Sequence, residues 1–230
     1  WRLIEQAKSG RKQITPNERT YSSLIKLCSR GGLVQQAMWV LDEEKMHNGC
    51  TNIVTYSALL DTCAKAGDLT TGKKVWNKMK GEGIRPNEVS FNTLINIYAE
   101  DSNPYNCKLH LENCLALLRD METENIKPDD QTYSSLIKVC TRGGLMTEAM
   151  QMFKDMKENR VVPNLAAYTT LINGFAKAGH LERVEIQSST DLLIREMKIT
   201  GVDPNVPIFT ALINLCATLK DLDRAERYFD

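Results

Sequence analysis

One segment of this chain occurs twice. Residues 20–33 read TYSSLIKLCSRGGL and residues 132–145 read TYSSLIKVCTRGGL, so twelve of fourteen positions agree at a separation of 112 residues. Related segments begin near residues 54, 89, 166 and 207. A segment that recurs along a chain is the sequence signature of a repeat architecture. The chain is therefore expected to fold as stacked copies of one short unit.

A proline followed by asparagine or aspartate closes most of the units and sets their register. Such pairs end at Asn17, Asn87, Asp129, Asn164 and Asn205, and Thr51 replaces the proline before Asn52. Starting each unit after the pair predicts a preceding tail and six repeats. Their ranges are 1–17 for the tail, then 18–52, 53–87, 88–129, 130–164, 165–205 and a shorter 206–230.

Two of the repeats are longer than the others. Three repeats have 35 residues, whereas those at 88–129 and 165–205 have 42 and 41. We expect the extra residues around Asn103–Leu109 and Glu185–Thr190, between or within the helices. The chain as a whole is interpreted as part of a longer protein.

Each repeat has the pattern of two amphipathic helices. In the first helix, apolar residues take positions 4, 7, 8 and 11 of the repeat, which is one face of a helix. A break containing glycine follows, as is typical of a helix C-terminus; it includes Gly31-Gly32, Gly67, Gly143-Gly144 and Gly179. A second apolar stripe then begins. Because one helical hairpin cannot bury both stripes alone, the predicted fold is all-α, a right-handed superhelical α-solenoid of stacked helix-turn-helix repeats.

Composition limits the kinds of function. The 29 basic and 29 acidic residues give a formal net charge of zero, so a nucleic-acid-binding face would have to be a local stripe. No stretch approaches the roughly 20 apolar residues of a membrane span. The seven cysteines are an odd number, which argues against a disulfide framework. Four of them take position 11 and are expected in the core as small apolar residues: Cys28, Cys63, Cys140 and Cys216.

These features resemble the pentatricopeptide repeat family, and the 35-residue period resembles its P-type class. The resemblance rests on the TYxxLI opening, the KAG break and the final Pro-Asn or Pro-Asp, and it covers nearly the whole chain. It implies sequence-selective binding of single-stranded RNA in a chloroplast or mitochondrion, in RNA stabilisation, processing or translation. It implies no enzymatic activity, cofactor, small-molecule substrate or membrane. The alternative is a structural subunit of an organellar ribosome or plastid transcription complex, with protein or ribosomal RNA as its partner.

A polar stripe on the first helix of each repeat is the candidate RNA-binding surface. Positions 2, 5, 9, 12 and 13 lie close together around a helix of 3.6 residues per turn, away from the apolar face. Stacking would align these stripes into a groove, and one repeat per base suits a single strand with splayed bases. A purely structural alternative stays open, in which these are solvated helix residues and the final Asn or Asp is an N-cap. The two roles are compatible at one residue.

The resemblance implies that position 5 and the last residue of a repeat together select a base. Ser22 with Asn52 and Ser57 with Asn87 are similar to adenine-reading pairs, as are Ser134 with Asn164 and Thr169 with Asn205. Asn92 with Asp129 is similar to a uracil-reading pair, and Thr210 begins a sixth pair. Since the family binds RNA with its N-terminus toward the 5′ end, the implied core is 5′-AAUAA-3′.

Positions 2 and 13 are the other implied contacts. Val54 and Val89 match the family's base-wedging residue at position 2, whereas Arg19, Gln131, Ala166 and Pro207 depart from it. Four residues match its phosphate-facing cation at position 13, namely Arg30, Lys65, Arg142 and Lys177, whereas Glu100 and Thr218 do not. The alternative is that such cations only interact with the helix dipole.

Metal and catalytic sites are not expected. Cys107, His110 and Cys114 are spaced i, i+3 and i+7 on one helical face, but no fourth ligand is evident and Cys114 also matches a small core residue. We find no phosphate-binding loop, nucleophile elbow or dinucleotide-binding fingerprint.

Overall fold

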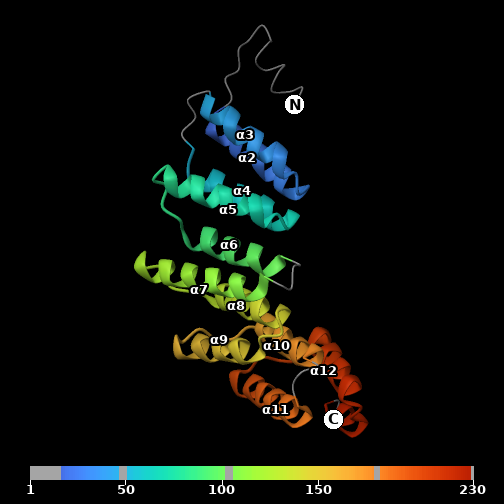
Figure 1. Cartoon of the computed structure of the whole chain (residues 1–230). Helices are drawn as coiled ribbons and strands as arrows, with labels where there is room; N and C mark the ends of the chain where they lie inside the picture. Colours follow the sequence, from blue (N-terminus) through green and yellow to red (C-terminus); the bar gives the residue numbers. More distant parts are fainter. Residues whose placement is uncertain (1–16, 47–50, 102–105, 179–181, 229–230) are drawn as a thin grey trace. The chain divides into compact units, whose positions relative to one another are not determined.

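The structure, a computed structural model, describes residues 17–46, 51–101, 106–178 and 182–228. Within these ranges the chain forms helices and no strands (Figure 1). The predicted tail at 1–17 therefore lies outside the described residues except for Asn17, as does Gly179. The described helices confirm the predicted all-α fold of stacked helix-turn-helix repeats.

The chain divides into two compact units, one ending at Asp101 and one beginning at Ser102. The division falls between the two helices of the predicted repeat 88–129. The first unit contains α2 (Glu18–Arg30), α3 (Val34–Met46), α4 (Ile53–Ala66), α5 (Leu69–Gly81) and α6 (Glu88–Glu100). The second contains α7 (Cys107–Thr123), α8 (Asp130–Arg142), α9 (Met146–Glu158), α10 (Leu165–Lys177), α11 (Arg183–Thr200), α12 (Val206–Leu219) and α13 (Leu222–Arg227).

The first helices of the repeats stack on one another inside each unit. In the first unit α4 packs against both α2 and α6, and in the second α10 packs against both α8 and α12. The apolar face predicted for α4 is buried at Tyr56, Leu59, Leu60 and Cys63. Aromatic side chains join successive repeats, since the Trp76 ring lies 4.9 Å from that of Phe91 in an edge-on arrangement. The repeat pattern thus produces one continuous core in each unit.

The second helices show where the longer repeats differ. Helices α3, α5 and α9 each have 13 residues, but α7 has 17 and α11 has 18. Much of the extra length therefore extends the second helix. Residues 102–105, part of the region expected to hold an insertion, lie outside the described residues.

Glycine at the break between the helices has two different physical reasons. Gly67 and Gly144 have φ angles of 66° and 68°, a left-handed conformation that favours glycine. Gly143 has an ordinary φ, but a Cβ atom there would lie 2.5 Å from the Cβ of Cys107. The first kind shapes the turn, and the second lets α7 approach α8.

One predicted core residue is wrong. Cys63, Cys140 and Cys216 are buried as expected, but Cys28 is only half-buried. The reason is its place in the stack: the described residues pack on α2 from α3 and α4, whereas α4 has a first helix on each side.

Candidate nucleic-acid interface

The last residue of each predicted repeat caps the next first helix. Asn52 Oδ1 accepts hydrogen bonds from the backbone N–H groups of Val54 at 2.9 Å and Thr55 at 3.2 Å. Asn87 Oδ1 accepts from Ser90 N at 2.9 Å. Asp129, Asn164 and Asn205 cap α8, α10 and α12 in the same way. The capping role expected for these residues is therefore present, and it fixes the orientation of each side chain.

The position-5 hydroxyl groups lie beside these caps in three predicted pairs. Ser134 Oγ donates to Asn164 Oδ1 at 3.1 Å. Ser22 Oγ lies 3.5 Å from Thr55 Oγ1, next to the Asn52 cap. Ser57 Oγ lies 3.3 Å from Ser90 Oγ, next to the Asn87 cap. Helix stacking thus brings position 5 of one repeat to the N-terminus of the next first helix.

Three side-chain hydrogen bonds orient the amide of Asn164. Its Oδ1 accepts from Ala167 N at 2.9 Å as well as from Ser134, and its Nδ2 donates to Asp130 Oδ2 at 2.8 Å. An amide NH₂ group has two N–H donors, so one donor remains after the bond to Asp130. The repeat pattern did not point to Asp130, although an acidic residue at position 1, directly after Asp129, was a visible signal.

Three other position-5 residues are placed differently. Thr169 Oγ1 donates to Leu165 O at 2.7 Å and Thr210 Oγ1 donates to Val206 O at 2.8 Å, so both hydroxyls bond to their own helix. Asn92 is buried, with only 4% of its surface exposed. Its predicted partner Asp129 belongs to the second unit, where it caps α8.

The position-2 side chains are exposed. Val54 and Val89 expose 47% and 59% of their surface. The four residues that depart from the wedge pattern are exposed as well: Arg19, Gln131, Ala166 and Pro207. Position 2 is thus open to a ligand throughout the described first helices.

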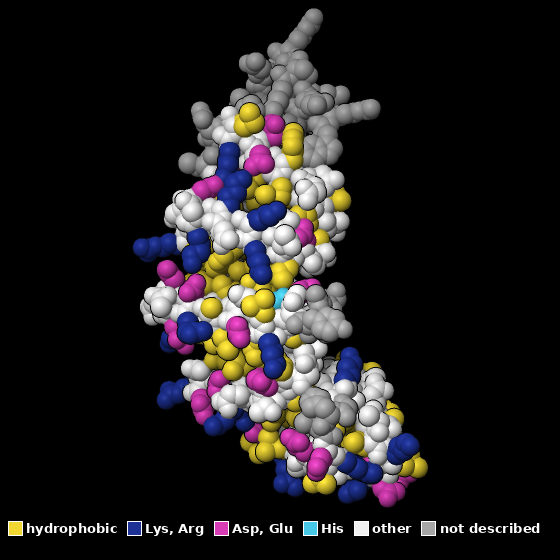
Figure 2. All heavy atoms as spheres, in the orientation of Figure 1, with side chains coloured by type: hydrophobic (Ala, Val, Ile, Leu, Met, Phe, Trp, Pro, Cys, Tyr) yellow, Lys and Arg dark blue, Asp and Glu magenta, His cyan; other side chains and the backbone are white. Residues whose placement is uncertain are grey.

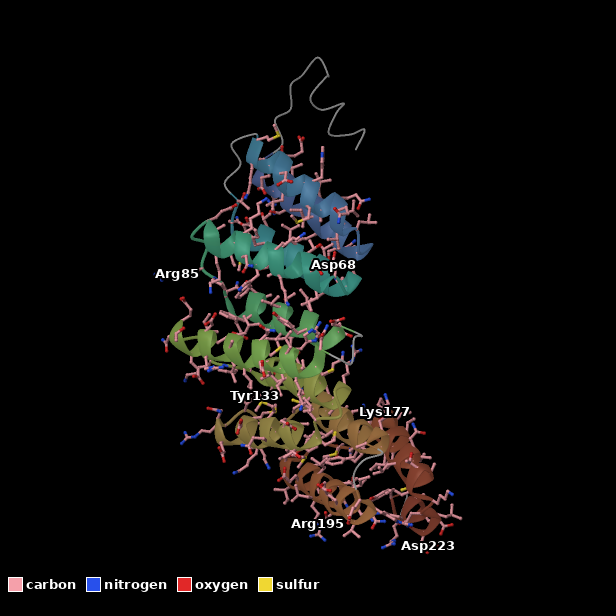
Figure 3. The ribbon with its side chains drawn as sticks, viewed as in Figure 1. Asp68, Arg85, Tyr133, Lys177, Arg195 and Asp223 are labelled. Carbon is pink, nitrogen blue, oxygen red and sulfur yellow. The ribbon has the colours of Figure 1, made fainter. Side chains whose placement is uncertain are left out.

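The four predicted phosphate-facing cations are all exposed but have different surroundings. Lys65 Nζ donates to Asp61 Oδ2 at 2.7 Å and to Ser29 Oγ at 3.0 Å. Lys177, labelled in Figure 3, lies at the C-terminal end of α10. It lines a groove with Arg142 and with Lys138, which the position-13 pattern does not include.

Charged and apolar side chains share the surface of the second helices. On the face in Figure 2, Lys and Arg side chains alternate with Asp and Glu. On α11, Val184, Leu192 and Ile199 are exposed, and Leu192 borders a groove of about 560 Å³ between α9 and α11. Exposed apolar residues on a second helix are the feature expected of a scaffold.

The cysteines have the chemistry of core residues. Burial raises the pKa of Cys63 and of Cys140 to about 12, which keeps both thiols protonated near neutral pH. Cys107, His110 and Cys114 are buried. Among the residues that the structure describes, no group of three or more His, Cys, Asp or Glu side chains is arranged to hold a metal ion. No described helix is long and apolar enough to cross a membrane.

Comparison with known proteins identifies the family. A model described as the pentacotripeptide-repeat region of PRORP matches residues 43–191. A pentatricopeptide repeat domain model matches residues 192–230, and a PPR repeat model matches residues 19–43. The chain belongs to the pentatricopeptide repeat family.

Relatives and a solved structure agree with this. The chain is 28% identical over 166 residues to the mitochondrial pentatricopeptide repeat-containing protein OGR1 of Oryza sativa, covering 72% of this chain and 26% of that protein. It is 23% identical over 170 residues to the small ribosomal subunit protein mL103 of Arabidopsis thaliana, covering 74% of this chain and 39% of that one. The crystal structure of PPR10 in complex with an 18-nt psaJ RNA element has the same fold, with a TM-score of 0.75 at 22% identity over 96% of this chain and 30% of that chain. The chain thus spans well under half of these proteins.

Proposed function

We propose that this chain binds single-stranded RNA with sequence preference, one base per repeat, around a core of 5′-AAUAA-3′. The contact between Ser134 and Asn164 carries the proposal, because it joins the two residues of one base-reading pair. The exposed position-2 side chains beside the pairs support the proposal, since an exposed apolar side chain there can pack against a base of the bound RNA.

The capping geometry gives a chemical reason for base preference. A capping Asn turns its Oδ1 toward the helix N–H groups, so its NH₂ group is the part that can meet a base. That group donates to an unprotonated ring nitrogen, such as N1 of adenine. Asp129 also caps with one oxygen, but its second oxygen can only accept, which suits the ring N–H of uracil. Asn at the last position therefore favours adenine, and Asp favours uracil.

The proposed setting is a chloroplast or mitochondrion, where the bound transcript would be stabilised, processed or translated. Relatives that are mitochondrial or ribosomal support this setting. The mechanism is capture of RNA and includes no chemical step and no cofactor. Any catalysis by the whole protein would require residues outside this chain.

Fluorescence anisotropy tests the proposal. A labelled single-stranded RNA containing AAUAA is titrated with the chain at near-physiological salt, and unlabelled AAUAA, AACAA and a double-stranded AAUAA serve as competitors. We expect AAUAA to compete best, because U-to-C exchange replaces the ring N–H that Asp129 accepts. Equal competition by all three RNAs would contradict sequence preference.

A scaffold in a large organellar assembly is the second candidate function. The exposure of Val184, Leu192 and Ile199 on α11 favours it, and so does the resemblance to a ribosomal subunit protein. Its test is co-sedimentation of the full-length protein with organellar ribosomal subunits, for the natural sequence and for a variant with these three residues changed to Ser. The scaffold function is supported if the natural protein co-sediments with the ribosomal subunits and the variant, although folded, does not. Co-sedimentation of the variant to the same extent as the natural protein argues against this function.

A further inference from the structure

Two grooves of the same construction differ in charge. One lies between α8 and α10 in the second unit and has a volume of about 400 Å³. The other lies between α4 and α6 in the first unit and has a volume of about 600 Å³. Both are lined by positions 9, 12 and 13 of one repeat and positions 9 and 13 of the next. They are therefore a matched pair.

The α8–α10 groove is cationic. Lys138 and Arg142 reach it from α8 and Lys177 from α10, and no acidic residue is among the described residues that line it. Arg142 and Lys177 end their helices, where a cation also interacts well with the helix dipole. Lys138 lies a full turn earlier, so the dipole does not explain its position. Three cations around one concave surface concentrate positive potential there.

Close helix packing holds these cations together. A Cβ atom at Gly174 of α10 would lie 2.8 Å from Cγ2 of Thr141 on α8 and 2.9 Å from Sδ of Met146. Glycine at this position therefore allows α10 to approach α8. The approach brings the ends of the two helices to one groove.

The α4–α6 groove carries the opposite charge. Asp61 occupies the place of Lys138, Glu100 occupies the place of Lys177, and Lys65 is the one cation of its described lining. Lys65 is held by Asp61 at 2.7 Å and by Ser29 at 3.0 Å. A phosphate group entering this groove would meet two carboxylates.

We infer that Asp61 and Glu100 keep RNA phosphates out of the α4–α6 groove, whereas the α8–α10 groove keeps the phosphate contact that the family resemblance implies for Arg142 and Lys177. The inference rests on the proposed RNA binding and restricts it. RNA is held by backbone and bases in the second unit and by base contacts alone at the α4–α6 groove. Lys65, which matches the family's phosphate-facing position, then makes no phosphate contact.

Three variants test the inference with the AAUAA RNA at several salt concentrations. In a single strand each phosphate contact contributes about 0.7 to the slope of log K against log salt. We expect the double variant Arg142→Gln with Lys177→Gln to bind RNA about tenfold more weakly. Because two contacts are removed, the magnitude of its slope should decrease by about 1.4. The matched variant Lys65→Gln changes affinity less than about twofold. The double variant Asp61→Lys with Glu100→Lys should bind RNA more tightly and should have a slope of larger magnitude.

Base preference and folding are the controls. Phosphate contacts carry no sequence information, so the ratio of affinities for AAUAA and AACAA stays the same in all three variants. Circular dichroism and the melting temperature check that each variant is folded. In Lys65→Gln, a loss of about threefold with a slope change of about 0.7, which is the effect of one phosphate contact, would overturn the inference while RNA binding stands. Absence of RNA binding by the unaltered chain would remove both the proposed function and this inference.

Discussion

Ser134 and Asn164 lie 30 residues apart in the sequence and are hydrogen-bonded, with Ser134 Oγ donating to Asn164 Oδ1 at 3.1 Å. The same oxygen accepts from Ala167 N and caps α10. One side chain therefore stabilises a helix and faces the neighbouring repeat. The cap is present in the structure, and the proposed base reading would use the same side chain.

Substitutions of Asn164 separate these two uses. Asn164→Ala removes the cap and should lower the free energy of unfolding by about 1 kcal/mol. Asn164→Ser should cost less, because Ser caps a helix about as well as Asn and places no second carboxylate beside Asp130 Oδ2. Urea denaturation of the two variants checks this. Equal destabilisation of both would show that the amide group, not the cap, matters for folding.

Gly174→Ala should destabilise the second unit. The added methyl group would lie 2.8 Å from Cγ2 of Thr141, so α8 and α10 must move apart at a cost of about 1–3 kcal/mol. Gly81→Ala is the matched control, since a Cβ atom at that position of α5 meets nothing within 4 Å. Alanine there should stabilise by up to about 1 kcal/mol. A melting temperature for Gly174→Ala at or above that of Gly81→Ala would refute the close-approach explanation.

The Glu82 carboxylate should make stability depend on pH. Burial favours its neutral form, but hydrogen bonds from Lys45 and from Tyr56, the latter at 2.8 Å, hold the pKa of Glu82 below its usual value. A lowered pKa in the folded state adds stability above the unfolded value of about 4.3, and this is lost as pH falls through the folded value.

Glu82→Gln should therefore melt at a lower temperature than the natural sequence at pH 7. The difference should shrink as the pH falls below about 4.3. Glu158→Gln, in the exposed pair with Lys154, is the control and should have little effect at any pH. A Glu82→Gln deficit that stays constant down to pH 2 would exclude the carboxylate as its source.

Thiol reactivity should report the different burial of the cysteines. Cys28 is half-buried, whereas Cys63 and Cys140 are buried with pKa values near 12. Iodoacetamide at pH 8 should modify Cys28 in the folded protein and modify Cys63 and Cys140 only after denaturation, because the thiolate is the reacting form. Peptide mapping by mass spectrometry follows each site. Early modification of Cys63 in folded protein would contradict the packing of α4.

Most of the fold could be predicted from the sequence because every repeat has the same pattern of two amphipathic helices. The described first helices begin at Glu18, Ile53, Glu88, Asp130, Leu165 and Val206, where the predicted repeats start. Cys28 was wrong because burial depends on what stacks against a helix, and the repeat pattern treats all copies alike. The sequence did not predict whether the extra residues of the two long repeats would extend α7 and α11 or form loops, since an insertion of six or seven residues fits either.

The candidate site was only partly visible in the sequence. Repeat positions identified Ser134 and Asn164 as a pair, and the structure places them in contact. The surroundings of Lys65 were missed in part because Ser29 comes from the preceding repeat, whereas Asp61 lies four residues before Lys65 on the same helix and was visible in the sequence. Comparing position 9 across repeats would have revealed the different charge of the two grooves, since Asp61 is negative and Lys138 is positive.

The most direct test of base reading is to change the preferred base by replacing the amide NH₂ group of Asn164 with a carboxylate oxygen. Anisotropy measures the affinity of the natural chain and of Asn164→Asp for RNAs containing AAUAA, AAUGA and AAUUA. The natural chain should prefer AAUAA, and Asn164→Asp should prefer a base with a ring N–H at the fourth place, guanine or uracil, by about fivefold or more. The same order of affinities for both proteins would contradict the account.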